Sequence, residues 1–145
     1  MNLTNTATDE SDPTWSPDGK VIAFESGPEG ARDIFGIDSS GSTPTAIAAP
    51  GGNDIDPEWS PDGQQLAFSS DGDIFVVNRT GSGLRRVLSR PSVDTDPTWS
   101  PDGRRIAFEA GDATGVDIYL VSVSGGEATR LTAAGSDSDP VFRPN

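Results

Sequence analysis

An eight-residue motif, Asp-Pro-x-Trp-Ser-Pro-Asp-Gly, occurs three times in this chain of 145 residues, beginning at Asp12, Asp56 and Asp96. A weaker fourth copy begins at Asp139. The steps from one motif proline to the next are 44, 40 and 43 residues. A period in this range indicates an array of small structural units that stack on one another. Such an array acts through the surface where equivalent loops of its units meet.

Each repeat contains four short segments with the composition of β-strands. They are rich in β-branched and aromatic residues and are bounded by Gly, Pro, Asp and Ser, which favours antiparallel hairpins. The second and third segments are apolar at consecutive positions, as in Val21–Phe24 and Ile74–Val77. Consecutive apolar residues indicate sheets that are covered on both faces. Four-stranded antiparallel sheets of this kind predict an all-β fold, the blades of a β-propeller.

The repeats predict one propeller segment over residues 1–145, with units at approximately 12–55, 56–95 and 96–138. Spacing places residues 1–5 as an outer strand of a preceding blade and residues 139–145 as an inner strand of a following blade. Three blades cannot close a ring, and open blades expose apolar faces and strand edges. We expect a second copy, arranged head to tail, to complete six blades. There are two alternatives. The chain is part of a longer propeller that another chain completes, or more than two copies form a larger homomeric ring.

The charge of the chain narrows the class of partner. It has 10 basic and 23 acidic residues, for a formal net charge of −13. Nucleic acid is excluded because a duplex repels such a surface and no basic stripe is present. Cations, basic peptides and partner proteins with basic surfaces are favoured.

Several absences in the sequence narrow the chemistry further. Without cysteine or histidine, the chain has no thiolate, no disulfide and no imidazole to act as metal ligand or general base. No apolar run approaches the length that spans a membrane, so no membrane contact is expected. Residues 1–5 have neither a basic region nor an apolar segment, so we expect no signal peptide.

Two acidic residues precede each inner strand. In a propeller these loops point at one mouth of the central channel, where like charges raise one another's pKa or recruit a cation. Ligand sets made only of oxygen suit Ca²⁺ or Mg²⁺. The candidate binding residues are Glu10, Asp12, Asp54, Asp56, Asp94, Asp96, Asp137 and Asp139. The candidate calcium ligands among them are Asp54, Asp56, Asp94, Asp96, Asp137 and Asp139.

The competing interpretation of these acids is structural. An aspartate just before proline often accepts backbone N–H bonds and caps a turn. We expect this role, with bonds to the neighbouring blade, for the aspartate of each Asp-Pro pair. The outer acid of each pair is then expected to be freer to meet a ligand; these outer acids are Glu10, Asp54, Asp94 and Asp137.

Three further sets of repeated residues receive structural roles. We expect the acids of the Pro-Asp-Gly turns to stabilise those turns; they are Asp18, Asp62 and Asp102. The acids that begin the third strands are expected to bond to backbone in the same blade; they are Asp33, Asp73 and Asp117. The motif tryptophans are expected to pack between blades and not to form stacking platforms for sugars or peptides; they are Trp15, Trp59 and Trp99. Phe142 takes their position in the fourth copy.

Together the motifs resemble the TolB-type propeller repeat, also called PD40 or the WD40-like β-propeller repeat. The resemblance rests on the Asp-Pro-x-Trp-Ser-Pro-Asp-Gly motif, an apolar strand ending in Ala-Phe, Asp-Ile-Tyr or Asp-Ile-Phe, and a closing Leu-Thr, and it covers nearly the whole chain. It implies a β-propeller, typically of six blades in TolB itself, and a periplasmic or extracellular location. Its members include a periplasmic partner-binding protein, peptidase propeller domains, lyases related by fold, and sensor modules of kinases. The chain departs from the enzymatic members, since it has no peptidase domain and no histidines such as the metal-dependent lyases use.

These observations predict a non-enzymatic scaffold that binds a protein, a peptide or a cation at an acidic channel mouth. Nucleophile–base pairs usually need His or an activated Lys, and Lys20 is the only lysine. The acids repeat in every unit, whereas a catalytic carboxylate pair should be asymmetric. A carboxylate-based hydrolase or lyase subunit and a purely structural calcium-stabilised module are the alternatives.

Overall fold

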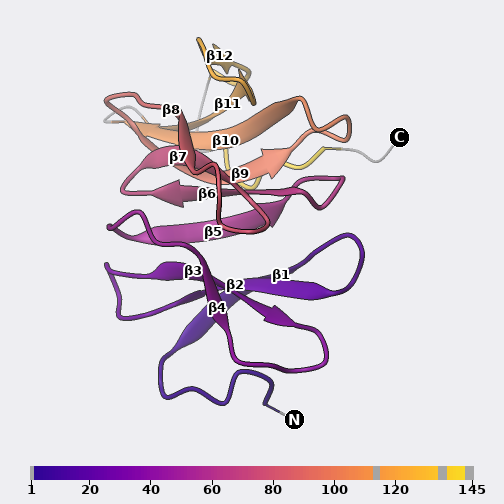
Figure 1. Ribbon diagram of the computed structural model, residues 1–145. Coiled ribbons are helices and arrows are strands. Elements are labelled where there is room, and N and C mark those ends of the chain that lie inside the picture. Colours follow the sequence, from indigo (N-terminus) through magenta and orange to yellow (C-terminus); the bar gives the residue numbers. More distant parts are fainter. Residues whose placement is uncertain (1, 113–114, 134–136, 143–145) are drawn as a thin grey trace.

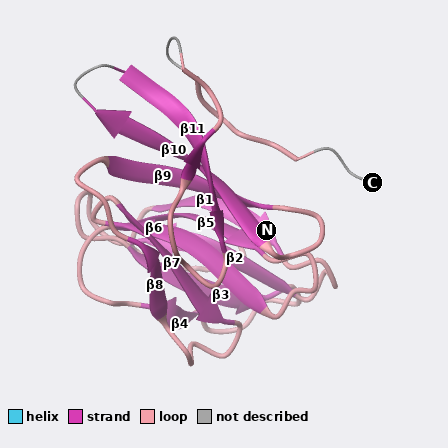
Figure 2. Cartoon of the chain, turned by 90° about the horizontal axis from the view of Figure 1, so that it is seen from above, coloured by secondary structure: helices cyan, strands magenta, loops and turns pink. Residues whose placement is uncertain are grey.

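The computed structural model describes residues 2–112, 115–133 and 137–142. In these residues the chain forms strands, turns and loops and no helix (Figure 2), and hence no helix that could cross a lipid bilayer. The strands are β1 (Glu10–Trp15), β2 (Val21–Ser26), β3 (Asp33–Asp38), β4 (Thr45–Ala48), β5 (Asp54–Trp59), β6 (Gln65–Ser70), β7 (Asp73–Asn78), β8 (Arg85–Leu88), β9 (Val93–Trp99), β10 (Arg105–Asp112), β11 (Gly115–Ser122) and β12 (Thr129–Arg130).

The strands form three antiparallel sheets of four strands, each built from consecutive segments of the chain. Their orders are β1-β2-β3-β4, β5-β6-β7-β8 and β9-β10-β11-β12. The sheets follow one another along the molecule as stacked layers (Figure 1). The sequence prediction of four-stranded blades is therefore confirmed, one blade for each full repeat.

The motif turn explains why each inner strand folds back on its neighbour. In the second blade, Gly63 has φ 66°, a value that favours glycine, and its N–H donates to Ser60 O at 2.8 Å. The Ser60 hydroxyl donates to Asp62 Oδ1 at 2.7 Å and accepts the N–H of Gln65 at 2.9 Å. The first and third blades repeat these bonds, so the motif encodes the same hairpin three times.

The hydrophobic core lies between the sheets. Leu66 and Phe68 of β6 belong to the cluster shared with the first blade, whereas Ala67 of the same strand belongs to the cluster shared with the third. All three side chains are completely buried. The middle sheet is thus covered on both faces, which is the arrangement that consecutive apolar residues predicted.

The motif tryptophans join neighbouring blades. Trp59 donates its indole N–H to Thr14 O of the first blade at 3.3 Å, and Trp99 donates to Glu58 O of the second blade at 3.0 Å. Their exposed fractions are 5% and 4%, so the predicted packing between blades is confirmed for both. For Trp15 the packing stays a prediction, because 56% of that residue is exposed on a blade face that no further sheet of the described chain covers.

The expected extra strands at the two ends are not observed. Residues 2–5 form no strand, and neither do residues 139–142; the remainder of the predicted segment lies outside the described residues. A strand needs a neighbour to satisfy its backbone groups, and the described chain supplies no sheet for these segments to join. Leu3 and Thr4 instead line an apolar pocket of about 190 Å³ on the outer face of the first blade.

Candidate functional site

Each Asp-Pro step of the inner strands forms a β-bulge. The pairing register shifts at this step in β1, β5 and β9. Asp12, Asp56 and Asp96 have φ values of 48°, 56° and 50°, and Asp139 in the fourth copy has 53°. Aspartate enters this region more readily than most residues, and the proline that follows has no N–H to leave unpaired. A bulge redirects the side chain out of the regular alternation of the strand.

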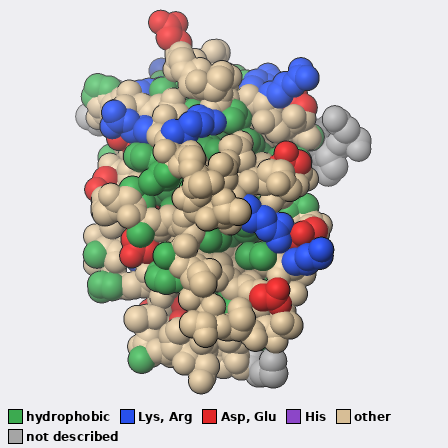
Figure 3. Space-filling model, in the orientation of Figure 1, with side chains coloured by type: hydrophobic (Ala, Val, Ile, Leu, Met, Phe, Trp, Pro, Cys, Tyr) green, Lys and Arg blue, Asp and Glu red, His purple; other side chains and the backbone are tan. Residues whose placement is uncertain are grey.

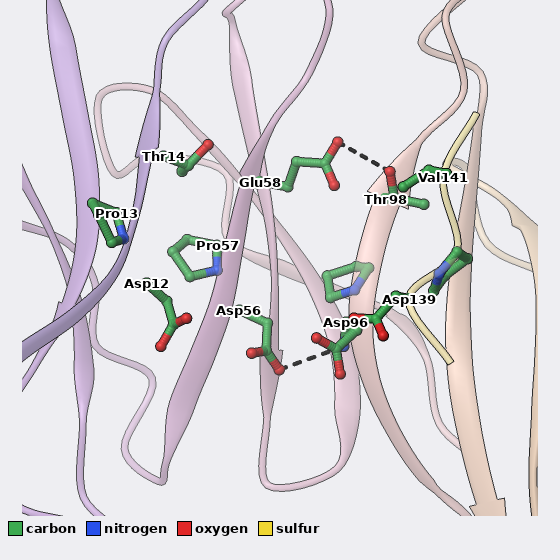
Figure 4. A pocket seen from close by; sticks show the side chains of 12 residues that line it. Asp12, Pro13, Thr14, Asp56, Pro57, Glu58, Asp96, Thr98, Asp139 and Val141 are labelled. Carbon is green, nitrogen blue, oxygen red and sulfur yellow. Dashed lines mark hydrogen bonds between the residues drawn. The ribbon is translucent and has the colours of Figure 1, made fainter. Parts of the chain in front are cut away.

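The redirected aspartates line one open cavity of about 410 Å³. They follow one another across the inner strands of the three blades and the segment that begins at residue 139 (Figure 4). The described lining contains no Lys or Arg and consists of Asp12, Pro13, Thr14, Asp56, Pro57, Glu58, Asp96, Pro97, Thr98, Asp139, Pro140 and Val141. The wall therefore combines carboxylates with the apolar rings of the prolines.

Backbone N–H groups of the Asp-Pro aspartates bond to the neighbouring blade. Asp56 donates to Glu25 Oε1 at 2.7 Å, and Asp139 donates to Glu109 Oε1 at 2.6 Å. Between the second and third blades, Asp96 donates to Asp56 Oδ2 at 3.4 Å. The side chain of Asp56 thus accepts a bond from the next blade, as the structural interpretation predicted, although the bond is long.

Burial makes three carboxylates of the wall, Asp56, Asp96 and Glu58, harder to ionise. It raises the pKa of Asp56 to about 7, and the negative charge of Asp96 adds to the effect. Burial also raises the pKa of Asp96, with a further contribution from the charge of Asp139. The pKa of Glu58 rises through burial, against the lowering effect of its bonds from Thr98 Oγ1 and the Trp99 N–H. A cationic group at this wall would relieve the repulsion and stabilise the charged forms.

The expectation that the outer acids are free is wrong for two of them. Asp54 and Asp94 are completely buried. Their backbone N–H groups donate to Arg32 O at 2.8 Å and Gly72 O at 2.9 Å, so each fastens its inner strand to the preceding blade. Because the bulge turns the following Asp-Pro aspartate to the cavity, the outer acid two residues earlier is left between the blades.

The other two outer acids lie apart from the cavity. Glu10 is exposed and accepts bonds from the hydroxyls of Thr4 and Thr6. The N–H of Asp137 donates to Val116 O at 3.1 Å, and this bond is equivalent to those that Asp54 and Asp94 make to the preceding blades. The structure therefore brings together the Asp-Pro aspartates and separates them from the outer acids.

Two acids at or beside the candidate site were missed by the sequence analysis. Glu58 lines the cavity at the position that Thr14 and Thr98 occupy in the other repeats. Glu25 is 1% exposed, and its Oε2 accepts a bond from Arg32 Nη1 at 2.5 Å. An acid within the apolar second strand, where Glu25 stands, was the available signal.

The remaining repeated acids divide into one confirmed set and one correction. The turn acids accept bonds from the serine of their own turn, as predicted, and this bond contributes most to holding the pKa of Asp18 near 2. Contrary to the expectation, the side chains of the acids that begin the third strands make no bond to backbone among the described residues. Asp73 pairs with Arg86 at 3.1 Å and Asp117 pairs with Arg130 at 2.5 Å.

No metal centre is formed in the described part of the chain. Within residues 2–112, 115–133 and 137–142, no group of three or more His, Cys, Asp or Glu side chains is arranged to hold a metal ion. The calcium site stays a prediction.

Residues 51–145 match the family model of the TolB β-propeller domain. No curated protein matches the chain in sequence. Among solved structures, a putative TolB from Agrobacterium tumefaciens is 26% identical with a TM-score of 0.76, over 88% of this chain and 50% of that one.

Two further structures share the fold. TolB from Acinetobacter baumannii is 24% identical with a TM-score of 0.71, over 91% of this chain and 33% of that one. A chain of the nidogen–laminin complex is 15% identical with a TM-score of 0.74, over 87% and 49%. The present chain thus spans about half or less of the length of these structures.

Proposed function

The chain belongs to the family of TolB β-propeller domains, and we propose that it is a non-enzymatic scaffold whose acidic cavity binds a basic segment of a partner protein or peptide. One observation carries the proposal. Asp12, Asp56, Asp96 and Asp139 come from four copies of one motif and line a single cavity, without a basic side chain among its described lining.

The chemistry of the wall supports a cationic ligand. The carboxylates follow one another at the spacing of the blades, so an extended chain crossing them meets one carboxylate after another. The raised pKa values of Asp56 and Asp96 indicate that no positive charge compensates these carboxylates. A Lys or Arg side chain of the ligand would supply that charge. The proline rings beside them would contact the aliphatic stems of such side chains. A propeller of this fold occurs in the complex of nidogen with laminin, which is a precedent for protein binding.

Calorimetric titration with a lysine- and arginine-bearing decapeptide tests the proposal at pH 8. We expect the double variant D56N/D96N to weaken binding at least about tenfold, a loss of roughly 1.4 kcal/mol. E29Q, which removes an exposed acid outside the cavity, is the matched control and should bind as the parent does. Equal affinity for the parent and the double variant would rule out the cavity as the binding site.

A carboxylate-based hydrolase or lyase is the competing function. It would need an acid and a base whose environments push their pKa values apart. At this wall burial raises the pKa of both Asp56 and Asp96 in the same direction, which favours binding over acid–base catalysis. Cleavage of an acidic or neutral glycan, lost on substitution of either aspartate alone, would favour the enzyme.

The predicted calcium site has its own test. A rise in melting temperature on addition of Ca²⁺, absent from D56N/D96N, would support an ion that stiffens the wall. An unchanged melting curve would remove calcium from the account.

We further propose that a second copy, placed head to tail, completes a ring of six blades. The exposed indole of Trp15 supports this, because Trp59 and Trp99 are buried by the preceding blade and donate to its backbone. Closure requires residues 137–142 to leave the third blade, since β1 of the second copy would make the contacts that this segment now makes. Those contacts include the N–H bonds from Asp137 and Asp139.

A further inference from the structure

The three blades allow a direct comparison of equivalent positions between repeats. Where the first blade meets the second, the N–H of Asp54 donates to Arg32 O, which brings Asp54 beside the segment that begins β3 at Asp33. Where the second meets the third, Asp94 donates to Gly72 O, beside Asp73 at the start of β7. We call the pair Asp33 and Asp54 the first junction, and the pair Asp73 and Asp94 the second junction.

Arginine side chains neutralise the second junction. Arg86 Nη1 lies 3.1 Å from Asp73 Oδ2, and Arg90 Nη2 lies 3.7 Å from Asp94 Oδ1. The guanidinium of Arg90 also lies 3.9 Å from the ring centre of Tyr119, so it is held between the blades. Two guanidinium groups thus face two carboxylates.

The first junction has the same acids and neither arginine. Strand register identifies the missing partner, because Ala46 pairs with Phe35 where Arg86 pairs with Phe75. The position of Arg90, four residues before the buried acid, is occupied by Pro50. On the face shown in Figure 3, basic side chains lie over the upper part and the middle right of the molecule, and none is seen over the lowest part, around β4.

The acids of the first junction are left without partners. Asp54 is completely buried, and neither carboxylate oxygen has a hydrogen-bond partner. Burial is the main cause of the raised pKa of Asp54; the Ser70 hydroxyl lowers this pKa but makes no bond of normal geometry. Asp33 is half-buried, and its side chain has no ion pair or hydrogen bond with any described residue. The charges of Asp33 and Asp71 add to the negative potential around Asp54.

We propose that the first junction binds the guanidinium of an arginine side chain from a partner, in the place that Arg86 occupies in the second blade. Asp33 is the carboxylate that such a side chain can reach from solvent. Asp54 lies behind it as an uncompensated buried charge, whose attraction is strong because little water screens it. The planar fork of arginine suits a carboxylate better than the point charge of lysine.

This inference deepens the proposed function and rests on it for the identity of the ligand as a basic segment of a partner. It adds a second contact point beside the cavity wall, because Asp54 precedes the cavity residue Asp56 by two positions on β5. It also predicts a preference for arginine over lysine at this point, which the open cavity alone does not require.

The test is a titration of the full chain at pH 7.5 with N-acetyl-arginine-N-methylamide, followed by carboxyl-carbon NMR. We expect saturable chemical-shift changes at the carboxyl carbons of Asp33 and Asp54. No change is expected at Asp73 and Asp94, because Arg86 and Arg90 already pair with them. The lysine analogue should bind more weakly. In A46R the new guanidinium should occupy the junction, and affinity for the arginine compound should fall at least about tenfold. A46Q has a long side chain without the charge and should keep the response.

Several results would overturn the inference. They are equal shifts at both junctions, a response of A46R equal to that of the parent, no response to arginine, or a response of Asp33 and Asp54 to Ca²⁺ alone, which would indicate a metal site. The double variant D56N/D96N separates this inference from the cavity proposal. If it keeps both the junction response and the affinity for the decapeptide, the cavity proposal fails while arginine recognition stands.

Discussion

At the scale of single residues, buried carboxylates set the dependence of stability on pH. The pKa of Asp54 is raised to about 6 and that of Asp56 to about 7, both chiefly by burial, from an ordinary value of 3.8. The folded chain therefore holds protons that the unfolded chain releases, and stability falls as pH rises through these values. The turn acids act in the opposite sense: the pKa of Asp18 is lowered to about 2 and that of Asp62 is also lowered, so their contribution is lost as pH falls below about 4.

We predict that the melting temperature is highest between about pH 4 and 5 and falls toward both pH 2 and pH 8. Thermal unfolding followed by circular dichroism at constant ionic strength checks this. A melting temperature that rises steadily from pH 5 to pH 8 would show that the buried carboxylates are neutralised by groups that this account omits.

Replacement of a single buried acid gives a second prediction. D54N removes a charge whose oxygens have no partner, so it should stabilise the fold at pH 8 by about 1–3 kcal/mol. At pH 4.5, where Asp54 is already protonated, the gain should vanish. The comparison variant D62A removes the oxygen that accepts two bonds in the turn and should destabilise the fold at both pH values. A D54N protein less stable than the parent at pH 8 would contradict the account of the junction.

At the scale of strands and blades, the tryptophan bonds predict unequal effects of one substitution. W59F loses the indole bond to Thr14 O and should cost about 1–2 kcal/mol in urea unfolding. W15F alters a side chain that is exposed in the single chain, so the contacts within one copy should lose less than about 0.5 kcal/mol. If the ring closes as proposed, W15F should in addition weaken association of the copies. A loss with W15F that equals the loss with W59F and does not depend on protein concentration would show that Trp15 is buried within one copy.

Local signals explain what the sequence predicted well. The Ser-Pro-Asp-Gly turn encodes its own bonds, so the hairpins and their number followed from the motif alone. An apolar run such as the one that ends at Phe68 indicates that both faces of its sheet are buried, even when the neighbouring blade is not known. The segments at residues 2–5 and 139–142 form no strand in the single chain, because a strand depends on a partner, so their place in neighbouring blades stays a prediction.

The site was predicted less well for a geometric reason. All the Asp-Pro aspartates were found, but the bulge turns Asp56 to the cavity and leaves Asp54 between the blades, where the sequence analysis expected Asp54 to be the freer acid. The partner of Asp73 is Arg86, which lies 13 residues later in sequence and becomes visible only once the register of β7 and β8 is known. Sequence spacing does not contain that register.

At the scale of the whole molecule, the described chain is an arc of three blades, and apolar side chains are exposed on the open face of the first blade. Blade faces inside the arc are buried in shared clusters, whereas Trp15 and the pocket beside Leu3 lie at its first face. Exposed apolar surface of this kind marks a contact site. The width of the cavity and the number of aspartates around it therefore depend on how many blades share the ring.

Sedimentation equilibrium across a wide range of concentrations is the most direct test of the claim that this arc needs further blades. The account predicts a species of twice the 15.1 kDa chain mass, with folding lost as dilution dissociates it. A well-folded monomer that persists at the lowest concentration would contradict it.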